Sequence, residues 1–307
     1  MTGAAGQVGW ELLRTLPALG EVVGVDLAEM DMFDPRQIRE TLTLLAPDVV
    51  INAAAYTAVD RAESEVEAAR IVNAEAPAVM AEVLRSRGGL LVHYSTDYVF
   101  DGTKIGAYVE DDPVNPLSVY GRTKLEGEKA VSASGVDHLI FRISWVYTDR
   151  GKNFLLTMLR LFEEREELRI VDDQVGAPTW ACWLAQATTE ALRKWLNAGK
   201  DVAREATGTY HMTAGGATSW YGFARAIHAR RYGANPGHGP RLIPISSAEY
   251  PVPARRPANS VLSNAKLKQR FGIPQRPWEE MLAEVMTPSP QPSPARGEGG
   301  SLRSREH

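Results

Sequence analysis

The sequence predicts an α/β protein with a Rossmann-like, doubly wound parallel sheet and a smaller substrate-binding lobe. Three observations lead to this fold class. A glycine-rich segment at residues 3–9 opens a helical pattern, and short apolar runs then alternate with helical segments along the chain. The 307 residues are 44% hydrophobic and 23% charged, the ordinary balance of a soluble globular protein. The length allows a sizeable core, in two domains or in one large unit.

Charge and cysteine content exclude several classes of protein. With 34 Lys+Arg against 38 Asp+Glu, the formal net charge is −4, which argues against intrinsic disorder and against a nucleic-acid surface built on bulk charge. The single cysteine, Cys182, cannot form an intrachain disulfide and favours a reducing, cytoplasmic location. Because no apolar run approaches the roughly 20 residues that span a bilayer, we expect no membrane partner.

The glycine-rich segment predicts a dinucleotide-binding loop. Gly3, Gly6 and Gly9 follow the pattern G-x-x-G-x-x-G, and residues 10–16 continue in helical spacing. Such glycines let the backbone approach a pyrophosphate at the helix N-terminus. Residues 21–25 then read as a short strand ending at Asp26, which is placed to bind the adenosine ribose hydroxyls.

The strand that normally precedes such a loop is missing from the sequence. Only Met1 and Thr2 come before Gly3, so we expect the first strand to be truncated, with the start lying within it. The alternative is that these glycines form a plain N-terminal loop.

The remaining pattern alternates strands and helices, which is typical of a parallel sheet covered on both faces. The expected strands are residues 47–52, 89–95 and 138–142, with His211 in a further strand at 208–212; the expected helices are 35–45, 62–87 with an interruption at Pro77, 119–134, 221–231 after a Ser219 cap, and 278–285.

These elements suggest a division of the chain. Residues 1–145 would form the dinucleotide-binding domain, joined by a returning segment around 178–212, and residues 146–286 would mainly form the substrate-binding lobe. Residues 287–307 are rich in proline and glycine and almost without apolar side chains, so we expect a disordered tail.

Two polar motifs at strand and helix ends predict a general acid–base site. Tyr120 and Lys124 are four residues apart and therefore project from one face of a helix. A nearby ammonium favours the phenolate, which would lower the tyrosine pKa from about 10 and make it a usable general acid or base. A hydroxyl from Thr96 or Ser95, at the end of the strand at 89–95, could hold a substrate carbonyl at the same point. By itself the Y-x-x-x-K spacing is common on surface helices.

The motifs together resemble the extended short-chain dehydrogenase/reductases, and within them the dTDP-4-dehydrorhamnose reductases. The resemblance covers about residues 2–286 and departs from the family at the missing first strand and in the tail. The matching stretches are TGAAGQVG at 2–9, NAAAYTAVD at 52–60, STDYVFDG at 95–102, PLSVYG at 116–121, RISWVY at 142–147, Asn153-Phe154, DDQVGAPT at 172–179 and RPANS at 256–260.

The resemblance implies a role for each matching residue. Tyr120 would protonate the C4 oxygen of dTDP-4-dehydro-L-rhamnose while a nicotinamide delivers hydride to C4, Lys124 would hold the nicotinamide ribose, and Thr96 would hydrogen-bond the carbonyl. Trp145 would lie against the deoxysugar, and Arg255 or Arg256 would pair with the diphosphate unless the two form a surface basic pair. The expected cofactor-binding residues are Gly3, Gly6, Gln7, Val8, Gly9, Asp26, Ala53, Ala54, Ala55, Tyr120 and Lys124; the expected substrate-binding residues are Ser95, Asp97, Trp145, Asn153, Asp173 and Arg256.

The residues leave the choice of cofactor and the identity of partners more open than the fold class. Asp26 would repel a 2′-phosphate, which favours NADH, while the family commonly accepts NADPH as well. Some relatives are associated with Mg²⁺, but the sequence contains no compact ligand cluster, so no metal site is expected. A nucleotide sugar is the expected small-molecule partner, and a homodimer is left open. The open alternatives are an epimerase or dehydratase of the same superfamily and a non-catalytic, dinucleotide-binding regulatory subunit. The presence of Tyr120 and Lys124 argues against the last.

Overall fold

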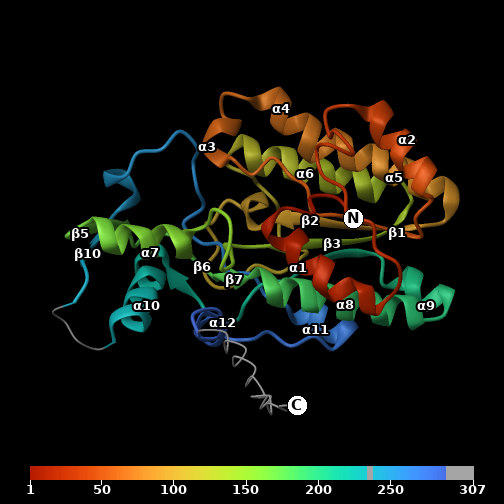
Figure 1. Ribbon diagram of the computed structural model, residues 1–307. Helices are drawn as coiled ribbons and strands as arrows, with labels where there is room; N and C mark the ends of the chain where they lie inside the picture. The colour runs from red at the N-terminus through yellow and green to blue at the C-terminus, as the bar shows by residue number, and fades with distance from the viewer. Residues whose placement is uncertain (234–237, 288–307) are drawn as a thin grey trace, which may run out of the picture.

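The structure, a computed structural model, describes residues 1–233 and 238–287. A parallel sheet lies between two layers of helices, and a second group of elements lies beyond one end of the sheet (Figure 1). Among the described residues no helix is long and apolar enough to cross a membrane. The expected tail at 287–307 lies, beyond Thr287, outside the described residues.

The central sheet has four parallel strands in the order β1-β2-β3-β8. They are β1 (Val49–Asn52), β2 (Leu90–Thr96), β3 (Asp137–Ile143) and β8 (Gly208–His211). Every residue of β2 is buried, as expected for a strand covered on both faces. The sequence pattern predicted this doubly covered parallel sheet, and the fold class is confirmed.

Helices cover both faces of the sheet. On one face lie α2 (Pro35–Leu45), α5 (Ala76–Arg87) and α6 (Val119–Ala133), and on the other α1 (Gln7–Thr15) packs against α8 (Ala181–Asn197) (Figure 1). Each face has its own cluster of buried apolar side chains. Because the strands are parallel, the loops that follow them gather at one edge of the sheet, where side chains for a site can meet.

The N-terminal segment differs from the expectation of a strand at residues 21–25. Only Val25 of that segment pairs, through a parallel bridge to Thr2, and Thr2 bridges to Asn52 on its other side. The Thr2 amide donates to the Ile51 carbonyl at 2.9 Å, and the Val25 amide donates to the Met1 carbonyl at 2.9 Å. The pairing does not extend into a longer ladder, because Met1 and Thr2 are the residues that lie beside this segment.

The helical region at 62–87 is interrupted before Pro77, not at it. It consists of α3 (Val59–Ala62), α4 (Val66–Arg70), a π-helical turn at Ile71–Glu75 and then α5. Pro77 lies in the first turn of α5, two residues after the π-helical turn ends, and Glu75 and Ala76 before it already have helical backbone angles. The interruption therefore comes from the π-helical turn.

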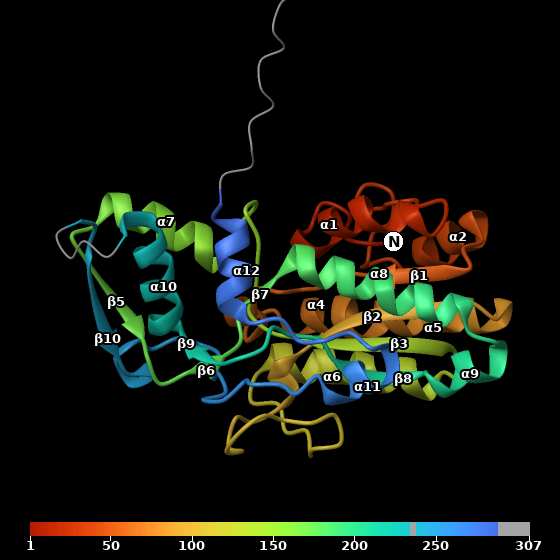
Figure 2. The same ribbon diagram turned by 90° about the horizontal axis from the view of Figure 1, so that it is seen from below.

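The second lobe combines helices with a two-stranded parallel sheet. In Figure 2, α7 (Phe154–Glu164) and α10 (Trp220–Tyr232) lie beside β5 (Glu167–Val171) and β10 (Arg241–Ile245). The helix α12 (Trp278–Val285) lies between this group and the sheet, with the bounds that the sequence predicted. The short elements are η1 (Leu16–Ala18), η3 (Asp97–Val99), β4 (Val146–Tyr147), β6 (Val175–Gly176), β7 (Thr179–Trp180), α9 (Lys200–Glu205), β9 (Thr218–Ser219), η4 (Ser247–Glu249) and α11 (Ala265–Phe271).

Candidate active site

A cavity of about 870 Å³ lies at the carboxyl ends of β2 and β3 and is lined by both the sheet edge and the second lobe. The site residues that the sequence predicted and that line it are Gly3, Gly6, Gln7, Val8, Asp26, Ala53, Ala54, Ala55, Ser95, Thr96, Asp97, Tyr120, Lys124, Trp145 and Asn153. Three others, Gly9, Asp173 and Arg256, are not part of its wall.

The glycine loop forms a close backbone turn at the N-terminus of α1. Gly3 has φ +67°, and a Cβ there would lie 2.7 Å from the Ala54 amide nitrogen. A Cβ on Gly9 would lie 1.9 Å from the Gly3 carbonyl oxygen, so no side chain fits at that position. The side-chain oxygen of Gln7, at the cavity wall, is buried without a hydrogen-bond partner in the described residues. The close backbone turn at the helix N-terminus fits the pyrophosphate part of a dinucleotide.

Asp26 lies on the cavity wall next to the glycine loop. Its Oδ2 accepts a hydrogen bond from the Ala5 amide at 2.8 Å, which ties Asp26 to the glycine loop. A second carboxylate lies beside it, because Glu29 accepts a hydrogen bond from the Asp26 amide at 2.9 Å. Leu27 and Phe33 add apolar wall at this end. The arrangement suits a free ribose diol and opposes an additional phosphate.

Tyr120 and Lys124 come from the first turns of α6, whose start is set by a Ser118 N-cap. The Ser118 hydroxyl accepts a hydrogen bond from the Gly121 amide at 3.2 Å. A Cβ on Gly121 would lie 2.3 Å from the Tyr98 carbonyl oxygen, so this glycine lets α6 pack closely against the loop after β2. As the spacing predicted, both side chains reach the same cavity.

The protonation of this pair differs from the expected direction. Desolvation raises the pKa of the Tyr120 phenol to about 12, and the nearby Asp97 carboxylate acts in the same direction. Desolvation also lowers the pKa of the Lys124 ammonium to about 8. Nζ of Lys124 donates to the Tyr94 carbonyl oxygen at 2.6 Å and lies 3.5 Å from Nε2 of His93. Tyr120 is therefore protonated at neutral pH, the form that a general acid needs.

The end of β2 brings three polar side chains to the cavity. The Thr96 hydroxyl accepts a hydrogen bond from the Tyr98 amide at 3.2 Å and donates to the buried Asp97 carboxylate at 3.0 Å. The Ser95 hydroxyl donates to Glu128 at 2.5 Å. Glu128 also receives two hydrogen bonds from the Arg142 guanidinium, at 2.9 and 2.7 Å, and both side chains are buried. Sequence reasoning did not find this ion pair beneath the site.

Aromatic residues form the wall on the side of the second lobe. The Trp145 indole stacks on the Trp220 indole, with ring centroids 3.5 Å apart. Trp145 has φ +47°, a left-handed backbone that is uncommon for a residue with a side chain, and its ring leaves no room for a Cβ on Gly176. Sequence reasoning missed Trp220; the signal available was an aromatic residue directly after the Ser219 cap.

Asn153, Asp173 and Arg256 make other contacts in this structure. The Asn153 side chain caps α7 by accepting from the Leu156 amide at 3.1 Å. The Asp173 carboxylate accepts hydrogen bonds from Ser247, and the Arg256 guanidinium forms an ion pair with Asp60 at 2.8 Å. The charges of Asp173 and Arg256 are therefore engaged away from the cavity wall, while Asn153 lines the cavity with its side chain used as the cap.

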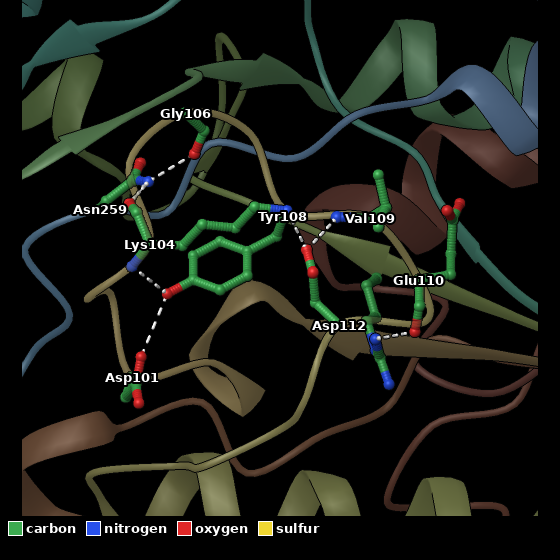
Figure 3. A network of polar contacts seen from close by, with 9 residues as sticks. Asp101, Lys104, Gly106, Tyr108, Val109, Glu110, Asp112 and Asn259 are labelled. Carbon is green, nitrogen blue, oxygen red and sulfur yellow. Dashed lines mark hydrogen bonds and ion pairs between the residues drawn. The ribbon is translucent and has the colours of Figure 1, made fainter.

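A network of polar contacts holds the loop that follows the STDYVFDG motif. Figure 3 shows Asn259 donating to the carbonyl oxygens of Lys104 and Gly106, at 2.8 and 2.7 Å, while Asp101 accepts from the Tyr108 hydroxyl at 3.1 Å. A Cβ on Gly102 would lie 2.6 Å from the Ala258 amide nitrogen. The segment around residues 256–260 is thereby held against the loop at residues 102–106.

No cluster of three or more His, Cys, Asp or Glu side chains suited to a metal ion occurs within residues 1–233 and 238–287.

A protonated tyrosine, a lysine and a hydroxyl beside a dinucleotide cradle define the class of Rossmann-type oxidoreductases known as short-chain dehydrogenase/reductases. Residues 1–290 match the family model described as "RmlD substrate binding domain". The chain belongs to this family.

Individual relatives agree with the family match. A Burkholderia thailandensis protein named dTDP-4-dehydrorhamnose reductase is 54% identical over 282 residues, covering 91% of this chain and 94% of the relative. The crystal structure of a dTDP-4-dehydrorhamnose reductase from Clostridium acetobutylicum superposes with a TM-score of 0.85 at 38% identity, over 93% of this chain and 96% of the other. A Bacillus anthracis enzyme of the same name, solved in complex with NADP, gives a TM-score of 0.82 at 33% identity, over 92% and 96% of the two chains.

Proposed function

We propose that this protein catalyses the NAD(P)H-dependent reduction of the C4 ketone of dTDP-4-dehydro-L-rhamnose to dTDP-L-rhamnose. The observation that carries the proposal is the meeting of Thr96, Tyr120 and Lys124 with the glycine cradle in one cavity. The similarity to relatives named for this reaction supports the choice of substrate.

The chain's own residues would do the following. Tyr120, protonated at neutral pH, donates its phenolic proton to the C4 oxygen as the alcohol forms. Lys124 is anchored by the Tyr94 carbonyl and is left with donors for the ribose hydroxyls of the cofactor. A bound nicotinamide cofactor supplies the hydride. The cradle at Gly3 and Gly9 and the carboxylate of Asp26 orient the cofactor's pyrophosphate and adenosine ribose.

The nucleotide sugar would occupy the part of the cavity between Tyr120 and the second lobe. The Trp145 face suits the apolar C6 side of a deoxysugar. Arg256 and Asp173 are proposed contacts only if they exchange their present partners, Asp60 and Ser247, for the ligand. Lys152, an exposed ammonium on the cavity wall, reaches the same space without such an exchange. A homodimer and a cytoplasmic location remain predictions from the sequence.

The direct test follows oxidation of NADH and NADPH, by their absorbance, on addition of dTDP-4-dehydro-L-rhamnose. We expect turnover with the wild type and a loss of at least about a hundredfold in kcat for Tyr120→Phe. The matched control is Tyr98→Phe, which removes a phenol from the same cavity wall while keeping the ring that contacts Tyr120 edge-on at 5.8 Å. Cofactor binding without any turnover would instead favour a regulatory subunit, and an isomerised sugar without net oxidation would favour an epimerase.

A further inference from the structure

One buried carboxylate at the site has no part in the steps above. Asp97 is 3% exposed and lies directly after Thr96. Its Oδ1 accepts from the Thr96 hydroxyl at 3.0 Å, and its Oδ2 accepts from the Ser144 hydroxyl at 3.1 Å. The Ser260 hydroxyl is a third donor. All three side-chain partners are neutral hydroxyls, so the contacts around this carboxylate depend on whether it carries a proton.

The Thr96 hydroxyl cannot serve Asp97 and a substrate at the same time. A threonine hydroxyl has one hydrogen and two lone pairs. In this structure the hydrogen is on the Asp97 side, and one lone pair accepts from the Tyr98 amide. The other lone pair faces the cavity, whose wall also includes Tyr120. In this state Thr96 is an acceptor toward the cavity and has no hydrogen for a ketone oxygen.

We propose that Asp97 is a positioning residue whose protonation decides whether the Thr96 hydroxyl donates toward the substrate. When Asp97 is ionised, it accepts the hydrogen bond from the Thr96 hydroxyl. Of Thr96 and Tyr120, only the Tyr120 phenol then donates a hydrogen bond to the ketone. When Asp97 is protonated, it is a weaker hydrogen-bond acceptor. The Thr96 hydroxyl then turns to the cavity and becomes a second donor to the ketone. The inference rests on the proposed reductase function.

The surroundings place this switch in an accessible pH range. Burial raises the pKa of Asp97 to about 6, partly offset by its hydroxyl donors. The titratable groups that face it are the phenols of Tyr98, in the same turn, and Tyr120, on α6. Arg256 approaches through the Tyr98 hydroxyl, and both phenols stay protonated at this pH. The pKa of Lys124, about 8, is well separated.

The test is the pH dependence of kcat/KM for four proteins: wild type, Asp97→Asn, Thr96→Val and Thr96→Ser. We expect kcat/KM of the wild type to rise about 3- to 10-fold as the pH falls through about 6, the value of one additional hydrogen bond in the transition state. Thr96→Ser keeps a hydroxyl and should retain this rise. Asp97→Asn has no titrating group and Thr96→Val has no hydroxyl, so both should lose it.

A second measurement does not depend on turnover. Carbon-13 NMR of labelled aspartate carboxyls follows Asp97 directly, with Asp97→Asn identifying its signal. Because the Thr96 hydroxyl stabilises the ionised form, Thr96→Val should raise the pKa of Asp97, while Thr96→Ser should leave it nearly unchanged. An unchanged pKa in Thr96→Val, or a pH-dependent rise in kcat/KM that persists in Thr96→Val, would overturn the proposal. Absence of reductase turnover with the expected NMR shift would contradict the proposed function and leave the Thr96–Asp97 contact supported.

Discussion

The indole rings of Trp145 and Trp220 are parallel to within 4°, with centroids 3.5 Å apart. Trp145 follows β3 of the central sheet, and Trp220 begins α10 of the second lobe. Phe154, at the start of α7, packs on the Trp220 ring at 4.6 Å. The stack therefore connects the catalytic edge of the sheet to the lobe that would hold the nucleotide sugar.

Removing the Trp220 ring should impair substrate binding more than cofactor binding. In Trp220→Ala the Trp145 indole loses its stacking partner, a contact of about 1 kcal/mol, and gains freedom to move in the cavity. We expect KM for the nucleotide sugar to rise about 3- to 10-fold while the Kd for the cofactor stays within twofold. Steady-state kinetics and cofactor titration measure the two effects. Trp220→Phe should recover most of the loss, and an equal loss of cofactor affinity would contradict this assignment.

Adding one methyl group to the glycine loop should abolish cofactor binding. A Cβ at Gly9 would lie 1.9 Å from the Gly3 carbonyl oxygen, so Gly9→Ala forces α1 away from the loop that cradles the pyrophosphate. We expect at least a tenfold increase in the Kd for the cofactor, measured by quenching of protein fluorescence, or loss of the folded state in a thermal melt. Gly199→Ala is the matched control, because a Cβ there meets nothing within 4 Å. Wild-type cofactor affinity in Gly9→Ala would place the pyrophosphate elsewhere.

Removing the charge of Asp26 should shift cofactor preference toward NADPH. The Asp26 carboxylate and its neighbour Glu29 repel a 2′-phosphate at this end of the cavity. Asp26→Asn keeps an oxygen that can accept from the Ala5 amide and removes one negative charge. We expect the ratio of the Kd for NADP⁺ to the Kd for NAD⁺ to fall about tenfold, measured by calorimetry. An unchanged ratio would mean that the 2′-position is held away from Asp26.

Removing one partner of the buried Glu128–Arg142 ion pair should lower the free energy of unfolding substantially. Arg142→Met leaves the Glu128 carboxylate buried without its bidentate partner, and such changes cost about 3–5 kcal/mol of unfolding free energy. Urea denaturation measures the loss. The combined variant Arg142→Met/Glu128→Gln, which leaves no buried charge, should recover part of it. Arg39→Met, at an exposed pair with Glu82, should cost less than about 1 kcal/mol, and a similar cost at both sites would refute the argument.

The sequence determined those parts of the fold and site that depend on local spacing. The helices at 35–45 and 278–285 have the predicted bounds, because caps, proline positions and apolar periodicity are properties of neighbouring residues. Tyr120 and Lys124 share a helix face for the same reason. Short motifs at strand ends were predictable too, since parallel strands bring their carboxyl ends to one edge.

Tertiary structure decided the contacts between distant segments. Arg256 pairs with Asp60 and Asp173 with Ser247, and no local pattern specifies those partners. The direction of the Tyr120 pKa shift was also decided there, because the surrounding fold removes water from the phenol and so raises its pKa. Spacing along the chain places a side chain on its own helix or strand, but charges, hydrogen bonds and stacked rings find their partners only when the elements pack.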